Sequence, residues 1–322
     1  MALTSKHYFP MKAIISYIHD FLREDFKGSY YLIILAFLSL AIFLNYKYNF
    51  WNQSLLDLEH SLEKFGILFV FYATPVFLTT LLHAYQYRET NKLRTNAFWF
   101  ATVYTILCLC LHHYSRDAAI HLASLTKIPE EISLFVVSCL LNLTRILFLL
   151  LPILLYKLFY DKDRGDFYGL IGKSADFKPY LVLLFIMLPL ILWASLQDSF
   201  QKVYPRYKPE TAEEYLGLSP WITFSLFEIT YALRFICVEL FFRGFLILGM
   251  QKILGNSCVM MMTCVYVFIH FGKPMPETIG SLFGGFMLGV ITLKSKNIYG
   301  GIFLHMGVAL LMEVVAILQW MH

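Results

Sequence analysis

Long apolar stretches, separated by short polar ones, run along almost the whole chain. Nine of them are long enough, or nearly so, to cross a hydrocarbon core, which takes about 20 helical residues per crossing. This pattern predicts an all-α fold: a multi-pass transmembrane helix bundle with about eight or nine spans. The seventh and eighth stretches are short, so we expect them to be surrounded by other helices rather than by lipid. The stretches centre on residues 30–46, 66–84, 97–114, 132–159, 180–196, 221–250, 257–271, 279–293 and 299–320.

A polar segment near the middle of the chain divides it into two predicted blocks. Residues 161–179 are polar and contain three glycines, which indicates a loop on the cytoplasmic side. We therefore expect an amino-terminal transmembrane block at 1–179 and a second block at 180–322. The first block opens with apolar residues interleaved with basic ones, a pattern that favours a short interfacial helix, although an ordinary soluble cap fits the same residues. The residues are Ile14, Ile15, Ile18, Phe21 and Leu22, with Lys12, His19, Arg23 and Lys27.

The charged residues predict an orientation and exclude one class of partner. Fifteen Lys and Arg fall in loops on one side and eight in loops on the other, so the positive-inside rule places the amino terminus in the cytoplasm. With 58% hydrophobic residues and a formal net charge of +4, the chain is typical of an integral membrane protein beside anionic lipid, and it lacks a compact basic surface for nucleic acid. The expected location is a bacterial cytoplasmic membrane. The six cysteines have the spacing of neither a zinc module nor a disulfide framework.

Ionisable side chains within the apolar stretches concentrate in the carboxyl-terminal block. Glu239 and Arg243 stand four residues apart in the sixth stretch, and we expect them to pair because a lone buried charge is unfavourable. At about 3.6 residues per turn, Glu228 lies on the same helix face. At about 1.5 Å per residue, counted from one side of the membrane, Glu239 lies about 16 Å deep and His270 about 20 Å, whereas His305 lies about 10 Å deep, so tilted neighbouring helices are needed to gather all three. The pattern predicts that these side chains converge.

A carboxylate and two imidazoles around a buried water are the groups that peptide hydrolysis needs, because one activates the water and the others stabilise the oxyanion. The water is either free or metal-bound. Hydrolysis by these groups requires no cofactor, but Glu239, His270 and His305 also make a plausible zinc set, without the His-Glu-x-x-His pattern of soluble zinc proteases. A simpler alternative is an internal ion pair and two interhelical hydrogen bonds that only hold the helices together.

These residues, in this order, resemble the CPBP family of intramembrane proteases, which includes the Ras-converting CAAX endopeptidases and the bacterial abortive-infection proteins. The family motif Glu-Glu-x-x-x-Arg is present as Val238-Glu239-x-x-x-Arg243, and Phe-x-x-x-His is present as Tyr266-x-x-x-His270. A glycine-rich span at 283–289 and then His305-x-x-x-Ala309 take the place of the third motif, which ends in asparagine. Small residues at 281, 285 and 289 also predict close packing between helices. The resemblance covers residues 220–320, and it implies that 180–322 is the protease core.

The resemblance implies a glutamate-type endopeptidase, a class formerly grouped with metalloproteases, that cleaves a hydrophobic or lipidated peptide, or a CAAX-like protein, within the membrane. We expect Glu239 to be the general base that activates water. Arg243 would orient this carboxylate, and His270 and His305 would serve as proton shuttle or oxyanion donors. The expected partners are membrane lipids and this substrate.

Two positions depart from the family pattern. Val238 replaces the glutamate that the family uses to activate water, and Ala309 replaces the asparagine that helps the oxyanion. The possible substitute acids are Glu228, Glu277 and Glu313, although we place Glu239 ahead of them. The departures also support an alternative function, an inactive family member that binds a membrane peptide as an immunity or scaffold protein.

Overall fold

The computed structural model describes residues 10–51, 61–170 and 176–320, and every regular element within these ranges is a helix. The predicted all-α class is therefore confirmed. The first half contains α1 (Pro10–Asp25), α2 (Gly28–Tyr48), α3 (Ser61–Gln86), η2 (Thr90–Arg94), α4 (Asn96–His113), α5 (Ser115–Leu125) and α6 (Glu130–Phe159). The second half contains α7 (Lys178–Ser195), α8 (Asp198–Gln201), α9 (Thr211–Leu216), α10 (Pro220–Glu239), η3 (Leu240–Gly249), α11 (Gln251–Leu254), α12 (Ser257–Ile269), α13 (Met275–Ser295) and α14 (Tyr299–Trp320).

Seven apolar helices in the described part of the chain are long enough to cross a membrane, so the protein is an integral membrane protein with a multi-pass bundle. Large apolar side chains such as Leu32 and Phe185 remain 69% and 66% exposed, as a lipid-facing surface requires. Two of the nine predicted stretches are helical but lie outside these seven: α10 with η3, and α12, which has only 13 residues. The seven are Gly28–Tyr48, Leu62–Gln86, Asn96–Leu125, Glu130–Phe159, Lys178–Ser195, Met275–Ser295 and Tyr299–Trp320.

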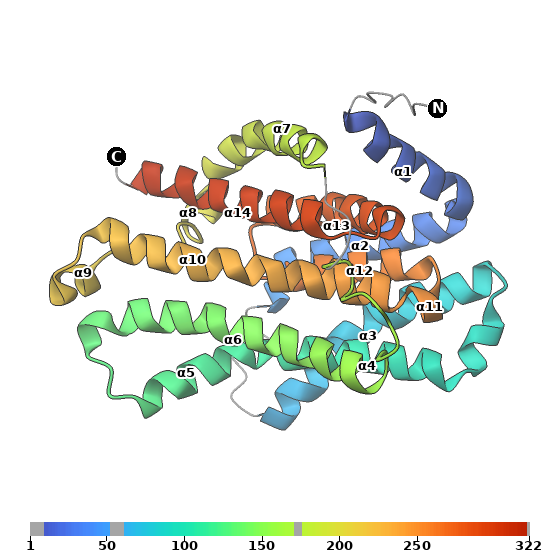
Figure 1. The fold of residues 1–322 in the computed structure, drawn as a ribbon, viewed down its shortest axis with the longest axis horizontal. Coiled ribbons are helices and arrows are strands. Elements are labelled where there is room, and N and C mark those ends of the chain that lie inside the picture. Colours follow the sequence, from blue (N-terminus) through green and yellow to red (C-terminus); the bar gives the residue numbers. More distant parts are fainter. Residues whose placement is uncertain (1–9, 52–60, 171–175, 321–322) are drawn as a thin grey trace.

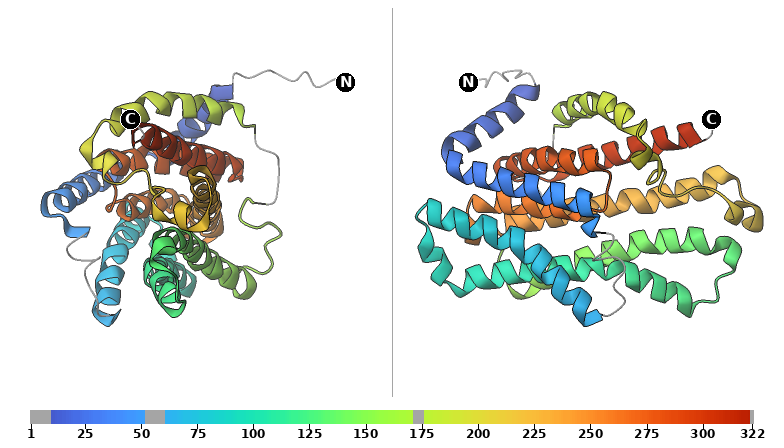
Figure 2. Two further views of the ribbon diagram at one scale, coloured as in Figure 1. Left: turned by 90° about the vertical axis from the view of Figure 1, so that its left-hand side faces the viewer. Right: turned by 180° about the vertical axis from the view of Figure 1, so that it is seen from behind.

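The long helices of the carboxyl-terminal half run side by side. α10 lies between α6 and α14 and contacts both, while α7 covers the outer side of α14 (Figure 1). Seen along the bundle, α2 and α3 lie on one side of this row (Figure 2, left). α10 thus carries the candidate acid on its buried face, whereas Ile229 and Leu233 on its other face remain 56% and 47% exposed.

The short helix α12 is almost completely enclosed. Every residue from Ser257 to Phe268 is buried, because α3, α13 and η3 contact it from different sides. A helix that is apolar on all faces belongs in such an interior position. The predicted small-residue stripe of α13 faces it: a Cβ added to Gly285 would lie 3.2 Å from the Tyr266 ring, and one on Gly289 would lie 2.9 Å from Met262. The expectation that a short span packs among other helices is confirmed for 257–271, whereas the stretch at 279–293 belongs to α13, which has 21 residues and leaves Phe283 69% exposed.

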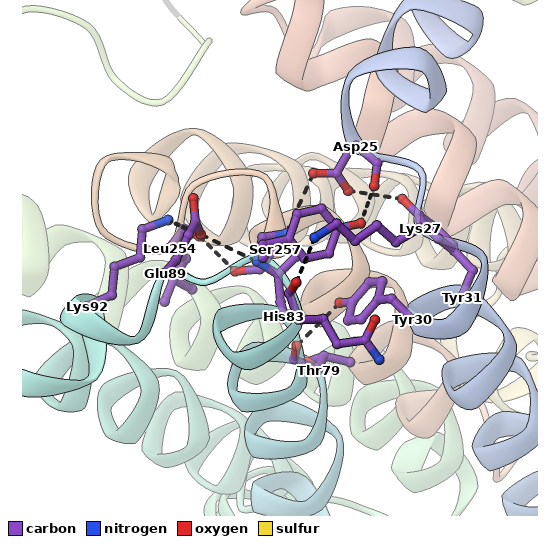
Figure 3. Close-up of polar contacts among 12 residues, drawn as sticks. Asp25, Lys27, Tyr30, Tyr31, Thr79, His83, Glu89, Lys92, Leu254 and Ser257 are labelled. Atoms are coloured by element: carbon purple, nitrogen blue, oxygen red, sulfur yellow. Dashed lines mark hydrogen bonds and ion pairs between the residues drawn. The ribbon is translucent and has the colours of Figure 1, made fainter.

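The loops richest in Lys and Arg meet at one end of the bundle. Nζ of Lys27 donates to the carbonyl of Gln86 at 2.6 Å, and Nζ of Lys294 pairs with Glu24 at 2.5 Å. Figure 3 shows a third junction, where the buried His83 lies 3.5 Å from carboxylate oxygens of both Asp25 and Glu89. These contacts join α1, α3 and α13 at a common end. Which compartment this end faces stays a prediction.

The connection after α6 packs against η3, which is a π-helix. Arg164 donates to the carbonyl of Leu248 at 2.8 Å, and the Tyr168 ring is fully buried beside the helix. Gly244 makes this approach possible, because a Cβ there would lie 2.8 Å from the Tyr168 carbonyl oxygen. Burial alone would raise the pKa of Asp166 in this loop, but hydrogen bonds from Arg164 and from the Gly169 N–H outweigh burial and lower it.

The helix predicted at the amino terminus is present as α1. Ile14 and Phe21 are buried against the protein, whereas Ile15 is 60% exposed, so the helix has one inward and one outward face. Contact with a membrane interface stays a prediction. The division into blocks 1–179 and 180–322 also stays a prediction, although the largest buried cluster contains residues from both, among them Tyr72 and Val259.

Candidate active site

Three helices bring the predicted polar side chains together. Glu239 is the last residue of α10, and Arg243 follows it in the π-helix η3. His305 lies in the second turn of α14, and His270 follows the last residue of α12. π-helical segments often occur at functional sites because they widen the helix locally and redirect side chains. The predicted convergence of a carboxylate and an imidazole from separate helices is therefore present.

Glu239 is fully buried and is the centre of the cluster. Its Oε1 atom accepts a hydrogen bond from Arg243 Nη1 at 2.7 Å and another from His305 Nδ1 at 2.7 Å. Arg243 is itself only 1% exposed. Removing one partner of such a buried pair leaves an uncompensated charge, which is unfavourable by about 3–5 kcal/mol. The ion pair expected from the i, i+4 spacing is confirmed.

His305 makes contacts through both ring nitrogens. A carboxylate can only accept, so Nδ1 carries the hydrogen that points to Glu239, and in the neutral ring Nε2 is left as an acceptor. The Tyr266 hydroxyl lies 3.2 Å from Nε2. The Phe235 ring packs edge-on against the imidazole at 4.6 Å, and the His305 side chain retains 17% of its surface. Carboxylate, imidazole and hydroxyl thus form a continuous array.

Tyr266 connects Arg243 and His270. The Arg243 guanidinium lies 4.2 Å from the centroid of the Tyr266 ring, and the Tyr266 backbone carbonyl accepts a hydrogen bond from His270 Nδ1 at 2.6 Å. The two rings of Tyr266 and His270 are 4.5 Å apart. His270 therefore reaches the Glu239 cluster through Tyr266. The sequence reasoning missed this hydroxyl, for which the only signal was tyrosine at the phenylalanine position of the second motif.

Comparison with known families agrees with this geometry. Residues 220–311 match the family of type II CAAX prenyl endopeptidase Rce1-like proteins. This range of the chain is therefore similar to the CAAX protease family, as the motifs predicted. The family is one of CAAX-type endopeptidases, and the matched range contains the four predicted catalytic positions. No curated protein and no solved structure matched the chain.

The two departures from the CAAX protease motif lie in apolar surroundings. Val238 is half-buried and packs against the largest core cluster. Ala309 is 6% exposed and belongs to a second cluster with Tyr231 and Phe235. Neither side chain offers a polar atom to a substrate. The site consequently depends on Glu239, its partners and the Tyr266 hydroxyl.

The three alternative acids lie outside this hydrogen-bonded cluster. Glu277 pairs with Lys273 at 2.9 Å and accepts from Tyr204 at 2.9 Å, while Glu313 accepts the Arg206 backbone N–H at 2.8 Å. Both carboxyl oxygens of Glu228 are buried without a hydrogen-bond partner among the described residues. Within residues 10–51, 61–170 and 176–320, none of these acids bonds to Glu239, Arg243, His270 or His305. Roles for them stay predictions.

Zinc binding at this site stays a prediction. Nδ1 of His305 and Nδ1 of His270 are directed at Glu239 and at a backbone carbonyl, respectively, which leaves Nε2 of each ring as the acceptor. Over the described ranges, no group of three His, Cys, Asp or Glu side chains is arranged to hold a metal ion.

Gly301, in the first turn of α14, determines the position of the Glu239 carboxylate. A Cβ at this position would lie 2.5 Å from Oε2 of Glu239, which has no hydrogen-bond partner among the described residues. We expect Gly301→Ala to displace the carboxylate and lower kcat/KM for peptide cleavage by about 10²-fold, since small displacements of positioned groups have effects of this size. Gly280→Ala is the matched control, because a Cβ there meets nothing within 4 Å. Equal activity of both variants would contradict the assignment.

Proposed function

We propose that this protein is an intramembrane endopeptidase that hydrolyses a peptide bond in a membrane-associated, CAAX-like substrate. The observation that carries the proposal is the array in which Glu239 holds one nitrogen of His305 and the Tyr266 hydroxyl lies at the other. A buried carboxylate that orients an imidazole toward a hydroxyl is an arrangement that supports proton transfer in acyl hydrolysis. The match of residues 220–311 to the CAAX protease family supports the same reaction class.

The contacts favour a division of roles that differs from the sequence-based hypothesis. Oε1 of Glu239 is occupied by two donors, and the side chain has no exposed surface from which to meet water. His305 retains accessible surface and a second nitrogen. We therefore infer that His305 accepts the proton of the attacking water, while Glu239 fixes the tautomer and stabilises the imidazolium.

The proposed reaction is a simple hydrolysis. The water oxygen attacks the carbonyl carbon of the substrate, and a proton of the water passes to Nε2 of His305. The C–N bond then breaks as the same proton passes to the leaving nitrogen, which gives one new carboxylate and one new amine. The Tyr266 hydroxyl is the proposed donor to the oxyanion, and His270, which donates through Nδ1 to the Tyr266 backbone carbonyl, is proposed to position Tyr266. Arg243 holds Glu239 ionised by direct pairing.

The proposed setting follows from the bundle. The substrate is a hydrophobic or lipidated peptide, because the site lies among helices that cross the membrane. The end at which the basic loops meet is proposed to face the cytoplasm, as the positive-inside rule expects. Lipids surround the outer helices, whose large apolar side chains remain exposed.

A direct test uses purified protein in lipid nanodiscs and a fluorescent, prenylated peptide of CAAX type with a free terminal carboxylate. Hydrolysis in water enriched in oxygen-18 is expected to give a shorter peptide whose new carboxyl group contains one heavy oxygen atom, detected by mass spectrometry. The His305→Asn variant is expected to give no product, because asparagine cannot accept the proton. Cleavage that persists in this variant would contradict the proposed base.

A second candidate function is peptide binding without turnover, as in an immunity or scaffold protein. The apolar side chains of Val238 and Ala309 at two motif positions favour it. In the same nanodiscs, this alternative predicts that the peptide binds without cleavage and that affinity falls in His270→Ala. Cleavage by the native protein decides against it.

A further inference from the structure

Three arginines lie close together beside the candidate active site without a carboxylate partner. They are Arg145 on α6, Arg206 in the connection between α8 and α9, and Arg234 on α10. Over the described residues, none of their guanidinium groups lies within 4.0 Å of an Asp or Glu oxygen, although seven other Lys and Arg side chains form such pairs. Unpaired cations within a membrane protein are unfavourable unless a ligand or water compensates them.

The Asn142 amide holds one of them, Arg234, at the interface between α6 and α10. Arg234 Nη1 donates to Asn142 Oδ1 at 3.1 Å, and Asn142 Nδ2 donates to Thr230 Oγ1 at 3.1 Å. Arg145 follows Asn142 by three residues, so both lie on the same face of α6. Arg145 is also within electrostatic reach of Arg234 and Arg206. The two helices thus direct like charges toward one region.

The nearby acids do not neutralise this region by direct contact. Glu277 is paired with Lys273 at 2.9 Å, and Glu313 binds the backbone N–H of Arg206 rather than its guanidinium. Glu228 lies near Glu313, and both of its oxygens are unpartnered among the described residues. Arg206 stacks on the Tyr204 ring at 5.1 Å. The guanidinium donors are therefore left for an anion.

A short peptide could span the distance between the arginines and His305. The Arg234 guanidinium lies 5.2 Å from the Phe235 ring, and that ring lies 4.6 Å from the His305 ring. Taken together, these distances place the guanidinium within about 10 Å of the imidazole, which is the length of about three extended residues.

We propose that Arg145 and Arg234, with Arg206 beside them, bind the carboxyl-terminal carboxylate of the peptide substrate. The inference rests on the proposed function for its choice of peptide, because His305 marks the position of the reacting bond. A planar guanidinium binds a carboxylate through two parallel hydrogen bonds, which fixes both position and direction. The subsite would thus select a free chain end and place a bond within three residues of it at His305.

Two peptides that differ in one group provide the test. Binding of the fluorescent prenylated peptide with a free carboxylate is compared with binding of the same peptide ending in a carboxamide. The measurement is fluorescence anisotropy with the protein in nanodiscs of neutral lipid. The carboxylate form is expected to bind the native protein about tenfold to hundredfold more tightly, the effect of losing charge-assisted hydrogen bonds. Arg234→Gln and Arg145→Gln should each reduce this preference. Lys127→Gln, at an exposed position before α6, should leave it unchanged.

Equal binding of the two peptides to the native protein would overturn the proposal without any variant, so a folding defect cannot obscure the result. A preference that disappears when phosphatidylglycerol replaces part of the neutral lipid would instead assign the arginines to a lipid headgroup and would also overturn it. Binding and cleavage are measured separately. If the protein prefers the carboxylate peptide but never cleaves it, the subsite is supported and the protease function is contradicted. If it binds and cleaves both peptides equally, the protease function is supported and the subsite is contradicted.

Discussion

Glu239→Gln is expected to reduce cleavage of a CAAX-type peptide by about 10³–10⁴-fold, the loss seen when a carboxylate that orients a catalytic imidazole becomes an amide. The amide cannot stabilise the imidazolium that forms on His305, and its N–H₂ group can turn toward Nδ1 and favour the wrong tautomer. Membrane insertion is expected to be unchanged, because the apolar spans that direct it are unaltered. Cleavage is measured as kcat/KM in nanodiscs, and insertion by protease protection.

Two control variants separate this effect from general damage. Glu239→Gln also leaves Arg243 buried without its partner, so a lower unfolding temperature is expected alongside the loss of activity. Glu214→Gln removes an exposed carboxyl group on α9 and should alter neither property. Glu228→Gln tests whether the unpartnered acid on the same helix is the true base. Full activity of Glu239→Gln, or complete loss in Glu228→Gln alone, would contradict the assigned roles.

The spacing of residues in the sequence was sufficient to predict the centre of this site. The i, i+4 separation predicted the bond between Glu239 and Arg243, and depth counted along the helices, together with helix tilt, predicted that His305 could meet them. Both predictions concern distances along regular helices, where the rise per residue is fixed. The family motif added the order of the residues, and the match at 220–311 confirms that resemblance.

Contacts between distant segments could not be read from the same pattern. Nothing in the composition of Leu240–Gly249 indicated a π-helix, because it depends on how this segment packs against Tyr168 and α13. The Tyr266 hydroxyl became relevant only when α12 and α14 were placed side by side. Asn142 and Arg234, 92 positions apart, meet because α6 lies along α10. Periodicity predicts elements, whereas these partners depend on tertiary packing.

The number of membrane spans could likewise be predicted only in part from the sequence, because it depends on tertiary packing as well as on local hydropathy. The stretch at 257–271 was apolar but too short to cross a membrane by itself, and the structure encloses α12 among α3, α13 and η3. Hydropathy identified this segment as buried. It could not show that the chain turns at 270–274, where His270 and Lys273 face different polar partners.

Val238→Glu is expected to raise peptide cleavage by about 10²-fold, the lower end of the contribution of a well-placed general base. Position 238 adjoins Glu239 on α10, and the resemblance places there the glutamate that activates water in the CAAX protease family. Ala309 lies one turn beyond His305 on α14, so Ala309→Asn in the same chain should add an oxyanion donor and raise kcat further. The measurement is kcat and KM with the prenylated peptide in nanodiscs.

Val238→Gln is the control for this gain, because it has nearly the same shape as the glutamate variant but cannot take a proton at neutral pH. It should leave the rate at the native value, and the gain in Val238→Glu should disappear as the pH falls below the pKa of the new carboxyl group. If the glutamine variant gains as much, the effect comes from packing and the assignment fails. If the glutamate variant cleaves and the native protein does not, the native chain is a peptide-binding member whose site lacks only its base. If a folded Val238→Glu, Ala309→Asn double variant stays inactive, the array of Glu239, His305 and Tyr266 is not a hydrolytic centre.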